Sequence, residues 1–378
     1  MKRRDFLKAS AASLVMLQCP TVFAFNPIAQ TKTKKVIWVM LRGALDPLHT
    51  LFPIGDPDFA GYRQSVVQPI QKSLLTLDHQ FSLHPDLAFL HQLYERKEMT
   101  PVVAVASGYR ERSHFDGQDQ LESGLDHTQH ENGWLARALN QYRGNGVAVA
   151  RTVPIALRGA TNDVDTWFPS SFPEADEDTL ARLADMYEGD THLAGLLEQA
   201  IEQTENPNMQ MKETHRPKFP FLAQRCGELL RNEQNTSCGM LEMGGWDTHN
   251  NMSKRLSRQF SLLDEGLKNI KTELGDTWQD TLIVISSEFG RTVKLNGTGG
   301  SDHGTGGVMF FAGGAVRNLG GKLQGGQVMG TWPGLHEDQL FEKRDLMPTT
   351  DIRFWLAEAL MSHWRLSPSQ IKAIFPDI

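Results

Sequence analysis

Acidic and imidazole side chains of this 378-residue chain gather in a few short segments that adjoin apolar runs. The richest segment begins after the run Leu282–Ser286, carries Glu288, Asp302 and His303, and ends at a second run, Val308–Phe311. We interpret both runs as strands of one parallel sheet. Oxygen and nitrogen donors of these types suit a hard or borderline divalent cation. Because open α/β sheets build their sites at strand ends, the segment predicts a metal site at the sheet edge.

Three more segments place side chains of the same kinds next to a predicted strand end. They carry Asp46, then Ser113 with His114 and Asp116, and finally Asp247 with His249. Each segment has an ordinary alternative. Asp46 can cap a turn, Ser113 can cap a helix, and Asp247 with His249 can be an ordinary helix entry. In the first segment, Glu288 can form a surface ion pair with Arg291, and His303 can be a solvated loop residue. The joint pattern favours a site, because carboxylates gathered at one sheet edge repel each other unless a cation or protons offset their charge.

A serine and two arginines could add catalysis to such a site. Ser113 stands at a predicted helix start, where free N–H groups and the helix dipole favour an anion. A hydroxyl close to a divalent metal also becomes a better nucleophile. Arg112 or Arg291 could offset the charge of such an anion. These residue types suit a nucleophilic reaction on an anion.

The side chains need a rigid frame, and the apolar pattern of the chain predicts one. Four runs of strand length are bounded by turn residues, namely Lys35–Leu41, Pro101–Ser107, Cys238–Met243 and Leu282–Ser286. A helix is predicted between the last two runs, because the chain from Leu256 to Leu274 keeps apolar residues at three-four spacing. Strands that alternate with helices predict one α/β domain, a three-layer sandwich around a central, mostly parallel sheet.

The segment Thr161–Thr236 interrupts this alternation. It is acidic, contains several prolines and is poor in strand-like runs. We interpret it as a mainly helical insertion, at about residues 161–236, that lies at the periphery of the sheet. Such an insertion would be the natural place for substrate selection, since binding residues often lie on segments that a rigid scaffold positions.

The N-terminus has the features of an export signal. Lys2–Lys8 contains paired arginines followed by Phe-Leu, Ala9–Val22 is apolar, and the residues up to Ala24 suit cleavage. The pattern predicts a twin-arginine signal peptide at 1–24, and hence a bacterial periplasmic or exported protein that meets the twin-arginine translocase. The alternative is an uncleaved N-terminal anchor, although the apolar stretch is short for a membrane span.

Charge and cysteine content argue against several other functions. The net charge of −7 becomes about −10 without the signal, which holds four basic residues and one acidic residue, and this argues against nucleic-acid binding. No later apolar run is long enough to span a bilayer. Cys226 and Cys238 could form a disulfide in an oxidising compartment or stay as free thiols. Neither adjoins the acidic and histidine segments, so a cysteine-ligated zinc site is not expected.

Several of the site segments form phrases that a known family shares. The phrases are Leu41–Gly43 with Asp46, Arg112–Asp116, Gly244–His249, Ser287–Thr292 and Asp302–Gly304. On these phrases, which span essentially the whole chain after the signal, the protein resembles an exported bacterial family of domains of unknown function (number 1501). That family in turn resembles the alkaline phosphatase-like and sulfatase-like superfamily.

The resemblance implies an alkaline phosphatase-like fold and a divalent metal, which could be zinc, calcium, manganese or magnesium. It implies Ser113 as the nucleophile, and Arg112 or Arg291 as the residue that offsets the charge of a transferred phosphoryl or sulfuryl group. The implied metal ligands are Asp46, Asp247, His249, Glu288 and His303, with Asp302 either a ligand itself or a residue that holds a ligand in place. These side chains are therefore expected to converge on one point, with Ser113 at a helix start facing it. The sequence departs from the superfamily at Phe289, where a ligating histidine is usual, and in the tighter spacing of Asp247 and His249.

Two functions follow from these observations. The first is an exported, metal-dependent hydrolase of phosphate or sulfate esters that acts through Ser113 on a small-molecule or polymer substrate. The second, which Phe289 favours, is a catalytically weak or inactive relative that serves as a periplasmic binding or assembly protein. Metal analysis separates the two, because the first function requires a bound ion.

Overall fold

The structure of the protein, a computed structural model, describes residues 33–169, 187, 193, 217–233 and 235–378. The predicted signal peptide at 1–24 lies outside these residues, and so does the middle of the predicted insertion. Among the described residues, no helix combines the length and the apolar character that crossing a membrane requires.

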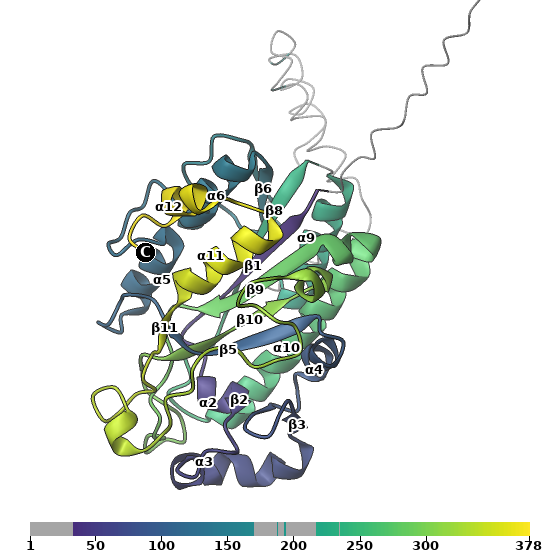
Figure 1. Ribbon diagram of the computed structural model, residues 1–378. Coiled ribbons are helices and arrows are strands. Elements are labelled where there is room, and N and C mark those ends of the chain that lie inside the picture. Colours follow the sequence, from purple (N-terminus) through teal and green to yellow (C-terminus); the bar gives the residue numbers. More distant parts are fainter. Residues whose placement is uncertain (1–32, 170–186, 188–192, 194–216, 234) are drawn as a thin grey trace, which may run out of the picture. The chain divides into compact units, whose positions relative to one another are not determined.

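A mostly parallel sheet of eight strands forms the centre of the described chain (Figure 1). From edge to edge its strands are β11 (Thr350–Asp351), β5 (Met99–Ala106), β10 (Gly307–Ala312), β9 (Thr281–Ser287), β1 (Lys35–Arg42), β8 (Thr236–Gly244), β6 (Asn145–Ala148) and β7 (Val164–Thr166). The neighbours run parallel except for β10, which is antiparallel to both β5 and β9. The four predicted core strands are confirmed as β1, β5, β8 and β9.

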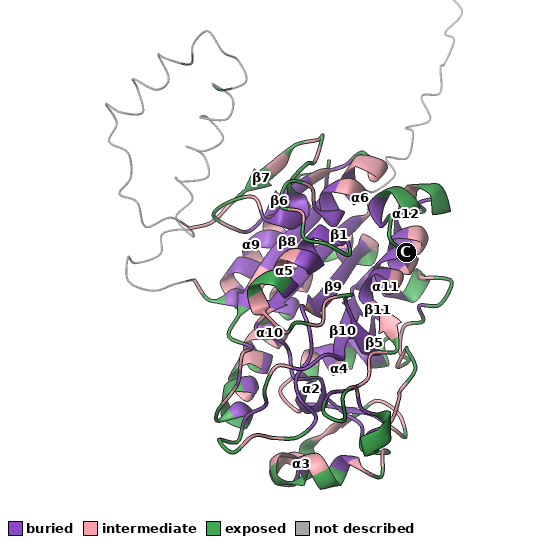
Figure 2. Cartoon of the chain, turned by 90° about the vertical axis from the view of Figure 1, so that its left-hand side faces the viewer, coloured by how far each residue is buried: buried purple, intermediate pink, exposed green. Residues whose placement is uncertain are grey.

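Helices cover both faces of this sheet and complete three layers. Alternate residues of β1 point to opposite faces, so Ile37 and Val39 join one apolar cluster while Val36 and Trp38 join the other. The first cluster includes residues of α3 (Phe59–Val67), α4 (Ala88–Glu95), α9 (Phe219–Asn232) and α10 (Met252–Leu274). The second includes residues of α5 (His114–Ser123), α6 (Trp134–Tyr142), α11 (Ile352–His363) and α12 (Pro368–Ile374). Burial on both faces, visible in Figure 2, explains why the strands are continuous apolar runs.

The direction of β10 decides where the loop before it lies. The sequence predicts that β9 and β10 are parallel. In that case the loop that enters β10 would lie at one edge of the sheet, and the chain that leaves β9 would lie at the opposite edge. That prediction is wrong for β10, which pairs antiparallel with β9, Phe310 lying opposite Ile285 and Ala312 opposite Ile283. Both ends of the connection 288–306 therefore lie at one edge, together with the carboxyl ends of β1 and β8. The topology thus brings the site segments to the same side of the sheet.

The two described ends of the segment 161–236 belong to the main fold. Val164–Thr166 forms β7, an edge strand parallel to β6. Helix α9 packs on α10 and β8, and it buries Phe219 and Leu230 in the core. This part of the segment is therefore not peripheral, because its apolar side chains form part of the cover of β8. The helical character of the middle of the segment stays a prediction.

The remaining elements are short. A second, three-stranded sheet contains β2 (Leu51–Phe52), β4 (Ser82–Leu83) and β3 (Leu75–Thr76), and α2 (Pro47–Thr50) directly follows the β1 turn. Cys226 on α9 and Cys238 on β8 are buried, unpaired thiols, which is one of the two alternatives that the sequence left open. Burial raises the pKa of Cys226 to about 12, so this thiol stays protonated at neutral pH.

Candidate metal centre

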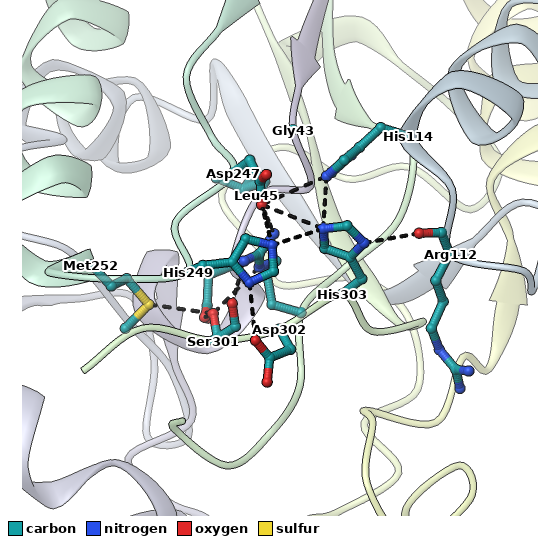
Figure 3. A network of polar contacts seen from close by, with 12 residues as sticks. Gly43, Leu45, Arg112, His114, Asp247, His249, Met252, Ser301, Asp302 and His303 are labelled. Carbon is teal, nitrogen blue, oxygen red and sulfur yellow. Dashed lines mark hydrogen bonds and ion pairs between the residues drawn. The ribbon is translucent and has the colours of Figure 1, made fainter. Parts of the chain in front are cut away.

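Three histidines and one aspartate converge at the carboxyl edge of the sheet (Figure 3). His114 is the first residue of α5, Asp247 and His249 follow β8, and His303 precedes β10. Each residue lies close to the point where the chain enters or leaves the sheet at this edge. The topology thereby joins distant parts of the chain, since His114 and His303 are 189 positions apart.

The donor atoms of these four residues lie close together at the edge of the sheet. Asp247 Oδ1 lies 3.0 Å from His249 Nε2, 3.4 Å from His303 Nε2 and 3.6 Å from His114 Nε2. His303 Nε2 lies 2.9 Å from His114 Nε2 and 3.0 Å from His249 Nε2. Tetrahedral ligands bonded at roughly 2.0–2.1 Å stand about 3.3–3.4 Å apart. His114, Asp247 and His303 can therefore hold a single ion after small shifts, since their donor atoms all lie within 4.8 Å of one another, and His249 lies beside them with its Nε2 3.0 Å from Asp247 Oδ1.

Each imidazole is held by an acceptor at its far nitrogen. The distance from Nδ1 to that acceptor is 2.8–3.0 Å in three pairs, His114 with Glu288, His249 with Asp302, and His303 with the carbonyl oxygen of Arg112. Carboxylates and carbonyls only accept, so each Nδ1 carries the hydrogen and each Nε2 presents a lone pair. Lone pairs that face each other at about 3 Å repel unless a metal ion or a proton lies between them. The arrangement is therefore suited to hold a cation.

The carboxylates of the site are stabilised in their charged form. Burial opposes the charge of Asp247, but Arg291 donates to its Oδ1 at 2.6 Å, and the net effect lowers the pKa of Asp247. Burial also opposes the ionisation of Glu288, but hydrogen bonds from His114 and Gln118 outweigh it and lower the pKa of Glu288. Both groups are thus carboxylates at neutral pH, which metal ligation and the orientation of an imidazole require.

The histidines differ in how readily they take up a proton. Burial lowers the pKa of His303, which favours the neutral form that can bind a metal. Burial acts in the same direction on His114, but the hydrogen bond and charge of Glu288 outweigh it and raise the pKa of His114. A proton therefore competes with a metal ion for this centre, as is usual where imidazoles are ligands.

Asp46 lies outside the centre, which corrects the predicted set of ligands. Its side chain is fully buried at the start of α2, and Oδ1 accepts from two backbone N–H groups of that helix. Its Oδ2 accepts from the guanidinium of Arg63 and from the hydroxyl of Ser301. Internal donors thus occupy both oxygens, so Asp46 is a structural carboxylate.

Glu288, predicted as a ligand, and Asp302, predicted as a ligand or as a residue that holds one, both lie behind the histidines. Glu288 is buried, and its Oε1 accepts from His114 and from the N–H of Gly43. The Oδ1 of Asp302 accepts from His249 at 3.0 Å. Each carboxylate accepts a hydrogen bond from one imidazole and thereby orients that ring. A carboxylate in this position also raises the basicity of the ring that it holds.

The three residues predicted for catalysis have different surroundings. Ser113 is the N-cap of α5, but its side chain makes no capping hydrogen bond in the described chain. The guanidinium of Arg112 pairs with Glu342 at 2.5 Å and with Asp345 at 3.0 Å, and it points away from the histidines (Figure 3). Arg291 is fully buried, and its charge is directed at the ligand carboxylate. Arg112 contacts the centre through its backbone carbonyl, which accepts a hydrogen bond from Nδ1 of His303.

Phe289 lies against the cluster. Its ring stacks on His114 with ring centroids 5.0 Å apart, and its centroid lies 5.6 Å from that of His303. The side chain is buried. An apolar wall at this position keeps water from one side of the centre and lowers the local dielectric. Phe289 thus stands beside the ligands, where the superfamily pattern has a ligating histidine.

His114 is the member of the centre to which the sequence analysis gives no role. The residue stands in the phrase Arg112–Asp116, directly after Ser113. One feature of the sequence indicates that His114 could belong to the site: it lies in the first turn of a helix that starts at this edge of the sheet. Whether such a ring faces the site or the solvent depends on the path of the chain before the helix, and this path cannot be inferred from residue types.

The fold and the centre define an α/β protein with three histidines and one aspartate at the carboxyl edge of its sheet. More particularly, the chain belongs to the family described as a protein of unknown function (DUF1501), whose model matches residues 88–375. This is the family that the sequence resembles. No curated protein matches the chain.

Several solved structures are similar to the described chain at low identity. The crystal structure of Ps i-CgsB in complex with k-i-k-neocarrahexaose is 10% identical, with 89% of this chain and 74% of that chain covered and a TM-score of 0.44. The alkaline phosphatase from the Antarctic bacterium TAB5 is 10% identical, with 91% and 99% covered and a TM-score of 0.38. The C-terminal periplasmic domain of EcEptC from Escherichia coli, in complex with Zn, is 8% identical, with 75% and 74% covered and a TM-score of 0.37. At these identities the likeness is one of fold alone.

Proposed function

We propose that this protein is a metal-dependent hydrolase of phosphate or sulfate esters in which Ser113 is the nucleophile. The observation that carries the proposal is the convergence of three imidazole Nε2 atoms on one carboxylate oxygen, with an acceptor at every Nδ1. In the proposed centre the ligands are His114, Asp247, His249 and His303. A bound divalent ion would lower the pKa of a nearby hydroxyl and offset the charge of the ester oxygens.

The donor set favours zinc or manganese among the four metals that the resemblance implies. Three imidazole nitrogens and one carboxylate oxygen suit borderline ions, whereas calcium and magnesium prefer ligand shells built of oxygen. The acceptors behind the three rings would keep them in the tautomer that can bind a metal. We expect metal analysis of the purified protein to find zinc or manganese rather than calcium or magnesium.

Ser113 is proposed as the nucleophile because of its position and its unused side chain. It directly precedes His114, and the free N–H groups of the first turn of α5 would hold an oxygen of the anionic ester. Its other neighbour, Arg112, has a φ of 60°, a strained conformation of the kind that persists at functional sites. Attack by the hydroxyl oxygen on phosphorus or sulfur would release the alcohol, and water would then hydrolyse the ester formed on Ser113.

The proposed place of action is the periplasm or the cell exterior. The support is the sequence of residues 1–24, whose paired Arg3 and Arg4 precede an apolar stretch and a small-residue cleavage site. The partner during export would be the twin-arginine translocase, and the substrate a small-molecule or polymer ester. A reporter fused to residues 1–24 should be exported, and replacing both arginines by lysine should stop its export.

An ester panel tests the reaction. Protein loaded with zinc or manganese is assayed against aryl phosphate monoesters, aryl phosphate diesters and aryl sulfates, with and without a chelator. Ser113→Ala should lower kcat by about 10³-fold or more and still bind the metal, because the hydroxyl is not a ligand. Activity that survives Ser113→Ala undiminished would overturn the assignment of the nucleophile. Protein that binds no metal under any of these conditions would overturn the centre.

A second function is favoured by the number of protein donors. Zinc sites with four protein ligands are commonly structural, whereas catalytic sites keep one position for water or substrate. With His114, Asp247, His249 and His303 all bound, the protein would be a catalytically weak or inactive periplasmic binding or assembly protein. Stoichiometric metal and a chelator-sensitive melting temperature, combined with no turnover of any ester, would favour this second function.

A further inference from the structure

A buried ion pair between Asp46 and Arg63 belongs to the same edge of the sheet. Both side chains are fully buried. Two guanidinium nitrogens of Arg63 donate to Asp46 Oδ2 at 3.0 Å, and the guanidinium also donates to the backbone carbonyls of Thr292 and Val293. Arg63 is thus a fixed cation, and it occupies the carboxylate that a second metal ion would need as a ligand.

Ser301 and Arg291 connect this ion pair to the ligand Asp247. The Ser301 hydroxyl donates to Asp46 Oδ2 at 2.6 Å, and Nε of Arg291 donates to the Ser301 hydroxyl oxygen at 3.4 Å. A second nitrogen of Arg291 donates to Asp247 Oδ1 at 2.6 Å. Arg291 is fully buried as well. The site therefore contains two permanent guanidinium charges, each paired with a carboxylate, within one chain of hydrogen bonds.

These fixed charges limit how many ions the centre can hold. Three carboxylates, those of Asp46, Asp247 and Glu288, accompany the two guanidinium groups and leave one negative charge. One divalent ion would leave a single positive charge, whereas two would leave three in a partly buried site, which is costly without further anions. Asp302 contributes less to this balance, because its side chain is 54% exposed and water screens its charge.

A single remaining positive charge matches an ester with one negative charge. Arg112 and Arg344, which also contact His303, are engaged by Glu342 and Asp345 and are not free to pair with a second substrate charge. Building on the proposed function, we infer that the centre takes one divalent ion and selects esters with a single negative charge over esters with two. Sulfate monoesters and phosphate diesters have one negative charge, and phosphate monoesters have two at slightly alkaline pH.

The number of bound ions tests the first half of the inference. Protein loaded with excess zinc or manganese and freed of loosely bound ions should carry one ion per chain. Asp46→Asn should leave that number unchanged, because Asp46 is occupied by Arg63, whereas the matched change Asp247→Asn should lower the affinity by about tenfold or more. Two ions per chain would overturn the inference, as would loss of the ion in an Asp46→Asn protein that still melts cooperatively. If Asp46→Asn does not fold, the count for the unchanged protein decides alone.

The charge of the substrate tests the second half. Para-nitrophenyl sulfate and methyl para-nitrophenyl phosphate carry one negative charge, and para-nitrophenyl phosphate carries two at about pH 8. For each ester, kcat/KM is divided by its uncatalysed rate constant. We expect this ratio to be about tenfold higher or more for at least one singly charged ester than for the doubly charged ester. The singly charged ester with the higher ratio shows whether sulfur or phosphorus is the preferred atom for attack. An equal or higher ratio for the doubly charged ester would overturn this inference and leave the proposed function standing. No turnover of any ester would overturn the proposed function.

Discussion

Each histidine of this centre is oriented by a group at the far side of its ring, as the proposed metal binding would require. Glu288 and the carbonyl of Arg112 each accept from one Nδ1 atom, and the corresponding Nε2 lone pairs face Asp247. A solvent-exposed histidine without such an acceptor could rotate and exchange tautomers. The acceptors therefore determine the geometry of the donor set together with the ligands themselves.

Replacing Glu288 by glutamine should weaken metal binding about 10- to 100-fold. The amide removes the negative charge, and it turns one acceptor oxygen into an N–H donor that faces other donors, among them Gly43 and His114. Affinity is measured by competition with a chromogenic chelator. Glu342→Gln is the matched control and should change affinity less than about twofold, because Glu342 is 57% exposed and contacts Arg112 rather than a histidine. Equal affinities of the Glu288→Gln and unchanged proteins would contradict the role assigned to Glu288.

The sequence predicts a set of ligands that the structure brings together only in part. It assigns Asp247, His249 and His303 as ligands, and all three lie in the cluster. It assigns Asp46 and Glu288 the same role, but an arginine and a histidine already use these carboxylates. Residue types and strand ends indicate which side chains reach the edge of the sheet. They do not indicate which oxygen faces inward or which buried cation pairs with it.

At the scale of elements, close contact between backbones fixes the connection from β9 to β10. A Cβ atom at Gly290 would overlap the carbonyl oxygen of Gly306. The N–H of Gly304 also donates to the carbonyl of Gly290 at 2.9 Å. This contact fixes the two arms of the connection to each other and positions His303, which directly precedes Gly304. Glycine is needed here because of the lack of space, since no positive φ is involved at Gly290.

Gly290→Ala should destabilise the protein by about 1–3 kcal/mol, because a methyl group has no room in this contact. It should also weaken metal binding, since His303 would shift with the loop. Gly297→Ala is the matched control in the same connection, because a Cβ there meets no atom within 4 Å. We expect its effect to stay within about 0.5 kcal/mol. Urea unfolding of both variants checks the prediction, and equal midpoints would contradict it.

The sequence predicts the positions of the core strands, but it predicts the wrong direction for β10. The apolar runs of β1, β5, β8 and β9 show their positions because both faces of the sheet are buried. A run such as β10, buried at every residue, fits either direction equally well. The connection 288–306 held the missing signal, because neighbouring parallel strands usually need a helical crossover and this Gly-rich segment has no helical pattern.

At the scale of the whole molecule, a histidine remote from the centre links stability to pH. His363 is buried on α11 and donates from Nε2 to the carbonyl of Lys35 at 2.9 Å. Burial lowers the pKa of His363 to about 4. The unfolded chain takes up this proton near pH 6.5. Stability from neutral His363 is therefore complete above about pH 6.5 and is lost as the pH falls towards 4.

His363→Gln should flatten the acid side of the stability profile. The shift of the pKa corresponds to about 3 kcal/mol between pH 6.5 and 4, and glutamine keeps an N–H donor for Lys35 without taking up a proton. The free energy of unfolding is measured by urea titration at several pH values. His130→Gln, at a side chain that is 59% exposed, is the control and should keep the slope of the unchanged protein. Parallel profiles for the His363→Gln and unchanged proteins would contradict the prediction.

The residues of the centre come from parts of the chain that are far apart in the sequence. His114 and His303 are 189 positions apart, and His249 and His303 are 54 apart. An ion held by these side chains would close loops of those lengths as a reversible cross-link, and it would bind only the folded chain. Resistance to proteolysis would then depend on the supply of metal, so the lifetime of the protein would lengthen as the concentration of free ion rises.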